Sequence, residues 1–289
     1  MTDLAQTRIG HPGSRLELPS VRLAWRLSMG TAILMAAQAA AGLSVPSIYR
    51  DVDWITAAWY GNDLVTLCIA APLLVWSLLA VQRGSQRAVL VWYSMLGFSV
   101  YNYAYYLFGA SLNWLFPAYV VLFTVPVFAL ILALGRLDAD RLAEEFSPTG
   151  TLRWVVGYML LSGGGLTLAW LGQWALFMTT GSEPAIGAEA FQLVAAIDLS
   201  LMVPWFLLGA VLLLRRKPWG YVIAPIIVMK GVTYTLVLTV TSTVAAQRGI
   251  DGSAGQIAVW AAWTVLGGLA IWGLLGNLPR RASPTGTLT

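Results

Sequence analysis

The chain has 289 residues, of which 58% are hydrophobic and only 10% are charged, and its mean hydropathy is +0.73. A soluble domain carries about 25% charged residues, so this composition excludes a water-facing surface and predicts a membrane protein. The single cysteine, Cys68, excludes an internal disulfide, and the single histidine, His11, lies in the polar N-terminal stretch. This argues against haem, copper or zinc held by histidine, and we expect neither a metal site nor a cofactor.

Eight apolar runs follow a polar tail at 1–21, and each is long enough to cross a bilayer as a helix. We predict an all-α fold, an integral membrane bundle of eight helices over 22–278, followed by a second tail at 279–289. The predicted spans are 22–46, 63–82, 87–109, 113–135, 153–178, 191–214, 219–246 and 255–277.

Two of the connecting segments have a pattern of their own. In the loop 46–62, apolar residues recur at helical spacing, which favours a short helix lying in the membrane interface. The connection 136–152 contains four acids and two arginines, which is typical of a short solvated helix.

The basic residues indicate the orientation of the spans. If both termini are cytoplasmic, fourteen of the 17 basic residues fall in cytoplasmic segments. Only Arg50 and Arg248 fall in external loops, and Lys230 lies within a span. This distribution follows the positive-inside rule and predicts that both the N-terminus and the C-terminus are cytoplasmic.

The order of polar residues suggests that eight spans are two sets of four. Gln38 precedes Asp63 by 25 positions, and Gln173 precedes Asp198 by 25 positions. After each aspartate come a proline and a basic turn, although the alignment needs a three-residue gap between the aspartate and the proline. A duplication with parallel topology and coincidence in an apolar sequence are both open; a duplication would bring these residues to the interface between the halves.

Asp198 and Lys230 are ionisable residues inside predicted spans. Because a charge in hydrocarbon costs at least a few kcal/mol, such residues usually face a protein interior, a partner or a water-filled cavity. A buried pair between Asp198 and Lys230 is the simplest arrangement. It would either fix two helices together or form part of a ligand or ion site, and a simply hydrated Asp198 near the external surface is the third alternative.

The stretch YNYAYYLFGASLNWLF, residues 101–116, is rich in tyrosine and asparagine. One explanation is an aromatic belt at the membrane interface. The other is an outward-facing aromatic cup lined by Tyr101, Tyr105 and Asn102, to which Asp63 and Asp198 would add negative charge. Such a cup would suit a cation or a polar ring, because aromatic faces attract cations.

That stretch, together with NDLVTL at 62–67 and RRKPWGYVIAPIIVMKG at 215–231, resembles a family of bacterial polytopic membrane proteins of about eight spans. The resemblance covers most of the predicted membrane region. It implies the bacterial inner membrane as the location, and it brings no assigned activity or catalytic residue.

The hypothesis that these observations favour is a protein that binds or transports a small solute or ion. Its candidate site residues are Asp198, Lys230, Asp63, Asn102, Tyr101, Tyr105, Gln38 and Gln173. The first alternative is a structural, sensory or assembly subunit. The second is an intramembrane enzyme acting on a lipid, which is less favoured because the acids are scattered. We expect the lipid bilayer as a partner and no nucleic acid.

Overall fold

The computed structural model describes residues 18–45, 47–147, 152–184, 186–250 and 252–278. Most of the predicted tail at 1–21 and all of the tail at 279–289 lie outside these residues. The described part is helical, as predicted, and contains no strand.

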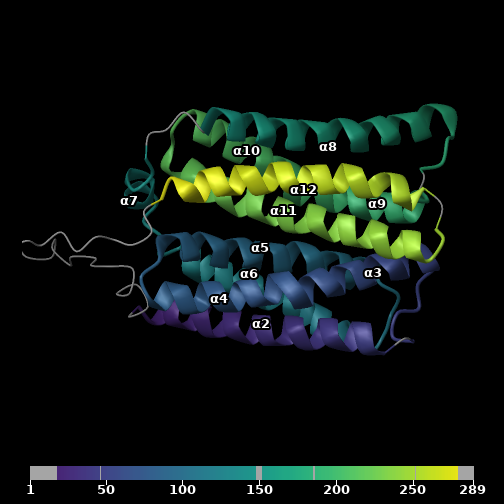
Figure 1. The fold of residues 1–289 in the computed structure, drawn as a ribbon, viewed down its shortest axis with the longest axis horizontal. Helices are drawn as coiled ribbons and strands as arrows, with labels where there is room; N and C mark the ends of the chain where they lie inside the picture. Colours follow the sequence, from purple (N-terminus) through teal and green to yellow (C-terminus); the bar gives the residue numbers. More distant parts are fainter. Residues whose placement is uncertain (1–17, 46, 148–151, 185, 251, 279–289) are drawn as a thin grey trace, which may run out of the picture.

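Eight long helical segments run along the long axis of the described structure (Figure 1). They are α2 (Pro19–Ser44), α3 with η1 and α4 (Asp53–Val65, Thr66–Ala70, Ala71–Gln82), α5 (Gln86–Gly109), α6 (Phe116–Leu134), α8 (Leu152–Thr180), α9 with η2 and α10 (Ala188–Ile197, Asp198–Met202, Val203–Leu214), α11 (Pro218–Gln247) and α12 (Ser253–Gly276). The short helix α7 (Ala139–Glu144) lies in the connection 136–152, where a solvated helix was predicted.

Seven of these segments, rather than the eight predicted, are long and apolar enough to cross a membrane. The exception is α5, which corresponds to the predicted span 87–109. It is 24 residues long, but serines, tyrosines and Asn102 reduce its hydropathy. Because most of α5 is buried against other helices, these polar groups face protein rather than lipid. The seven apolar helices support a multi-pass membrane protein.

The second predicted span begins earlier than expected. Its helix starts at Asp53 rather than at residue 63 and continues through α3, η1 and α4 to Gln82. The apolar face at helical spacing in 46–62 is therefore the first part of a long helix, not a separate helix in the interface. Asp63, which was expected as the first residue of a span, consequently lies ten residues after the start of the helix.

Two layers of helices can be followed in Figure 1, with α2 to α6 in one and α8 to α12 in the other. The inner helices α5 and α11 pack against each other, α11 also packs against α3, and α5 packs against α9. The start of α2 and the end of α12 lie at the same end of the bundle as α7 (Figure 1). The other end contains the starts of α3 and α9.

One turn of π-helix interrupts a long helix in each layer. These turns span Thr66–Ala70 and Asp198–Met202, and each has a proline two residues after its end, Pro72 or Pro204. A proline ring clashes with the carbonyl group four residues before it, and a wider turn relieves this clash. Equivalent positions lie 132 residues apart: 66 and 198, 72 and 204.

The same spacing holds at the turns that follow. Gly84 lies between α4 and α5 with a φ of 79°, and Arg216 lies between α10 and α11 with a φ of 50°. Arg216 is the one non-glycine residue with positive φ in the described ranges. The helices after these turns start at Gln86 and Pro218, again 132 positions apart.

Close contact between the layers depends on a glycine in α3. A Cβ atom on Gly61 would lie 2.7 Å from the Cα atom and 2.8 Å from the backbone nitrogen of Thr241 in α11. No side chain larger than hydrogen fits there unless the two helices move apart.

We therefore expect Gly61→Ala to lower the thermal stability of the purified protein in detergent, because overpacking costs about 1–3 kcal/mol. Gly172→Ala is the matched control, since a Cβ atom on this glycine of α8 has no neighbour within 4 Å. Alanine favours a helix over glycine by about 1 kcal/mol, so the control should melt at the same temperature or higher. Equal melting temperatures for the two variants would contradict this account of the interface.

Candidate functional site

Asp198 lies at the first position of the π-turn η2, and its side chain is only 3% exposed. Three side chains donate hydrogen bonds to its carboxylate. Tyr101 and Tyr105 of α5 donate to Oδ1, the latter at 3.3 Å, and Trp170 Nε1 of α8 donates to Oδ2 at 2.9 Å. The two phenol oxygens are 2.8 Å apart. This Asp198 centre joins α5, α8 and η2 away from water.

Lys230 of α11 belongs to the same centre, but it does not form the expected direct pair with Asp198. Its Nζ atom lies 2.7 Å from the ring centroid of Tyr101 and 4.9 Å from that of Tyr234, and it contacts the Met202 sulfur atom. Tyr101 therefore lies between the two charged groups: its hydroxyl group donates to Asp198 and its ring receives the ammonium group. The structure replaces the predicted ion pair with an aromatic bridge.

Asp63 forms a second centre in the first layer, and it is fully buried. Gln38 Nε2 of α2 and the hydroxyl group of Tyr106 in α5 donate to its Oδ1 atom at 3.1 and 2.9 Å. Tyr49, in the loop between α2 and α3, donates to Oδ2 at 2.5 Å. The oxygen of the Gln38 side chain accepts from Tyr103 at 2.7 Å. This Asp63 centre thus contains four oriented side chains around one carboxylate.

Helices α2 and α3 pack closely at the Asp63 centre. A Cβ atom on Gly42 of α2 would collide with the Asp63 carboxylate and with the hydroxyl group of Tyr49. The Tyr106 ring stacks on Trp59 at a centroid distance of 4.5 Å. The space around the carboxylate is therefore filled by protein atoms.

The predicted site residues separate into these two centres. Asp198, Lys230, Tyr101 and Tyr105 form one of them, and Asp63 and Gln38 belong to the other. Gln173 contacts neither and is exposed on α8.

The tyrosines of 101–106 do not form an open cup, because their side chains are buried in the bundle. Asn102 lies between the tyrosines in sequence and is also fully buried, and neither atom of its side-chain amide has a hydrogen-bond partner among the described residues.

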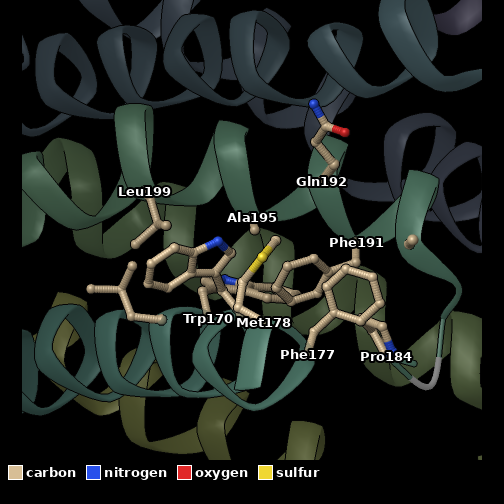
Figure 2. Close-up of a pocket in the computed structure, with 11 residues that line it drawn as sticks. Trp170, Phe177, Met178, Pro184, Phe191, Gln192, Ala195 and Leu199 are labelled. Carbon is tan, nitrogen blue, oxygen red and sulfur yellow. The ribbon is translucent and has the colours of Figure 1, made fainter. Parts of the chain in front are cut away.

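A groove of about 530 Å³ lies between α8 and α9 (Figure 2). Its lining is mostly apolar and includes Trp170, Phe177, Met178 and Phe191. Trp170 connects this groove to the Asp198 centre, because its ring lines the groove while its indole N–H group donates to Asp198. A molecule in the groove would be separated from the carboxylate by one indole ring.

The chemistry of both centres is that of a carboxylate surrounded by donors. In the described ranges, no group of three or more histidine, cysteine or acidic residues could hold a metal ion. Proton or cation exchange at the carboxylates is what such centres can perform, and the same hydrogen bonds can also hold helices together.

Several residues of the centres were not among the sequence candidates, namely Tyr49, Tyr103, Tyr106, Trp170, Tyr234 and Met202. One signal was present in the chain. Trp170 lies 132 positions after Gln38, and both donate an N–H group to the carboxylate of their own layer. An alignment anchored on the turns rather than on the aspartates pairs Gln38 with Trp170 instead of Gln173.

No protein-family profile, curated protein or solved structure matches the chain. The resemblance inferred from the sequence thus stays an expectation.

Hydrogen bonding in the Asp198 centre can be tested with two matched variants. Tyr101→Phe removes a donor to a buried carboxylate while keeping the ring beneath Lys230, so we expect a loss of about 1–3 kcal/mol in unfolding free energy. Tyr105→Phe should cost less, because its hydroxyl group is 3.3 Å from Oδ1. Denaturant unfolding in detergent micelles measures both, and a larger loss for Tyr105→Phe would refute this ranking.

Proposed function

We propose that this protein binds a proton or small cation at the Asp198 centre and uses it to move a small solute or ion across the bilayer. In this proposal Asp198 holds and releases the ion, and Lys230 supplies the counter-charge through Tyr101. The observation that carries it is the position of Asp198. It lies in the interior of a membrane-crossing helix, at a π-helical turn, with three donors and a buried ammonium group nearby.

Two physical arguments support an exchange site over a purely structural one. Burying an ionisable group in a membrane helix costs free energy, so such a residue is by default a candidate for an ion or substrate pathway. Single π-helical turns within α-helices occur frequently at functional sites.

Solute access requires a second conformation, because the centres are closed in the described one. We propose an internal duplication in which α2 to α6 and α8 to α12 are parallel repeats, and transport proceeds by movement of one half against the other. The common spacing of 132 residues supports this proposal. The outward-facing aromatic and acidic cavity inferred from the sequence would be the open state.

The orientation in the membrane is part of the same proposal. We infer that α5 also crosses the bilayer, shielded by its neighbours, so that the chain crosses eight times with both termini in the cytoplasm. The described basic residues support this: Arg83, Arg136 and Arg215 lie at the end of the bundle that contains α7, whereas Arg50 and Arg248 lie at the other. The bacterial inner membrane is the location that we propose.

The alternative is a structural, sensory or assembly subunit without transport. The observation in its favour is the dense packing of both centres, in which donors from several elements of the chain reach each carboxylate. In that case the donors would serve only to fix the helices.

Proton movement into proteoliposomes that contain a pH-sensitive dye tests transport. With an inside-negative potential imposed by potassium and valinomycin, we expect uptake in wild type and its loss in Asp198→Asn at equal protein content. Glu189→Gln is the control, because Glu189 is an exposed acid on α9, nine residues before Asp198. Full uptake by Asp198→Asn would sink the proposal.

Native mass spectrometry of the purified protein separates a ligand site from a structural one. We expect wild type to retain a small molecule that Lys230→Met loses, because the ammonium group would be part of the binding site. An empty wild type, together with a Lys230→Met variant that is only less stable, would favour the structural alternative.

A further inference from the structure

The Asp63 centre differs from the Asp198 centre in its charge. Lys230 lies beside Tyr101, which donates to Asp198, so the second layer has a cation of its own. At the spacing of 132 residues, the counterpart of Lys230 in the first layer is Phe98, a buried apolar side chain. Asp63 therefore has no such cation.

The titratable groups that face Asp63 from the surrounding elements are phenols. Tyr49 comes from the loop, Tyr103 and Tyr106 from α5, and Tyr119 from α6. α2 presents the neutral Gln38, and α11 approaches α3 at Thr241.

Charged side chains lie farther out, toward the end of the bundle where α3 begins. Asp51 accepts from Trp59 Nε1 at 2.9 Å and from Ser111, and the Arg248 guanidinium group lies 4.6 Å from the Tyr60 ring centroid. Among the described residues, no ammonium or guanidinium group pairs with Asp63.

The ligand chemistry of the Asp63 centre selects a proton over a metal ion. A hard cation needs about six oxygen lone pairs directed at it. Here Gln38 and the two phenols direct hydrogen atoms at the carboxylate, and the Gln38 oxygen already accepts from Tyr103. The backbone of Gly42 closes the remaining side. A proton needs no cavity, and it neutralises a buried carboxylate that has no cation beside it.

Tyr49 links the Asp63 centre to the loop between α2 and α3. It is buried and lies outside the long helices, and its hydroxyl group donates to Asp63. Burial, followed by the nearby Asp63, raises the pKa of Tyr49, so this phenol keeps its proton and stays a donor. The loop thereby brings a proton-carrying group from the end of the bundle into contact with the carboxylate.

We propose that Asp63 is a second proton-binding site, which exchanges its proton with the external side by way of Tyr49: the phenol passes its hydrogen-bonded proton to the carboxylate while its oxygen takes another from the external side, so it stays neutral. This inference rests on the proposed function in that both treat buried carboxylates as exchange sites. It assigns the two halves different roles: the Asp198 centre contains a fixed cation, and the Asp63 centre is neutralised by a proton taken from solution.

Infrared difference spectroscopy of the full chain in lipid nanodiscs, titrated with acid and base, tests the proposal. A protonated aspartate has a carboxylic acid C=O stretching band that its ionised form lacks. We expect a reversible band of this kind in Asp198→Asn, where Asp198 cannot contribute, and its loss when Asp63→Asn is added to that variant. A double variant that keeps the full band of Asp198→Asn, or an Asp198→Asn protein without a band over the pH range in which it stays folded, would overturn the proposal.

If Asp63→Asn does not fold, a second pair of variants tests whether the band belongs to Asp63. Tyr49→Phe removes a donor to the ionised form, so the band should remain and its midpoint should move to higher pH by about one to two units. Tyr60→Phe is the control, since this neighbouring ring contacts Tyr49 and Arg248 and, among the described residues, donates no hydrogen bond to Asp63, so its midpoint should match wild type. An unshifted midpoint in Tyr49→Phe overturns the assignment.

The outcomes separate this inference from the proposed transport. A band that belongs to Asp63, combined with no proton uptake by wild-type vesicles, keeps the second site and removes transport. Uptake that depends on Asp198, without a band from Asp63, removes the second site alone.

Discussion

A carboxylate that is removed from water must find hydrogen-bond donors within the protein, and this requirement governs how the helices of this chain are arranged. Transfer of an unpaired charge into an apolar medium costs far more than a folded domain can supply. Each buried aspartate here recruits three donors from at least two other elements. The donors fix the separation and rotation of α2 and α3 in one layer and of α8 and α9 in the other, with α5 serving both.

The π-helical turns show how backbone and side-chain requirements are met together. Pro72 and Pro204 prevent a regular α-helix immediately before them, and the wider turns that result lie next to or at the buried acids. In one layer the turn begins with Asp198. In the other it begins with Thr66, one helical turn after Asp63, because α3 is three residues longer than α9. The two halves thus share a backbone pattern, and each has placed its acid at a different position relative to the turn.

The sequence predicted the helical architecture more completely than it predicted the site. Prolines, glycines and basic turns mark the ends of the spans, so most predicted boundaries lie within a few residues of the helix ends. The predicted count of eight apolar membrane-crossing helices was wrong, since seven are apolar enough. The eighth, α5, has polar side chains that only a surrounding bundle can accommodate. The early start of α3 was missed because its first residues include two tryptophans and a tyrosine, which are equally typical of an interfacial segment.

The composition of the centres was harder to predict, because it depends on which way side chains point. A direct pair between Asp198 and Lys230 was the simplest expectation, yet the Tyr101 ring lies between them. Gln173 has the right spacing from Asp198 but points away from it, and Trp170, nearly one turn earlier, takes its place. A three-residue difference on a helix rotates a side chain by about 300°, and no composition-based argument resolves such a choice.

The helix α5 supplies Tyr101 and Tyr105 to one carboxylate and Tyr106 to the other. Because these tyrosines lie within six residues of one helix, they cannot move independently of each other. A rotation or shift of this helix that loosens one set of hydrogen bonds must disturb the second. If both aspartates exchange protons as proposed, their protonation equilibria are thermodynamically linked, and a change in occupancy at one alters the affinity at the other by the same factor in both directions. One rigid helix with tyrosines on two faces is sufficient to couple two acids that make no contact with each other.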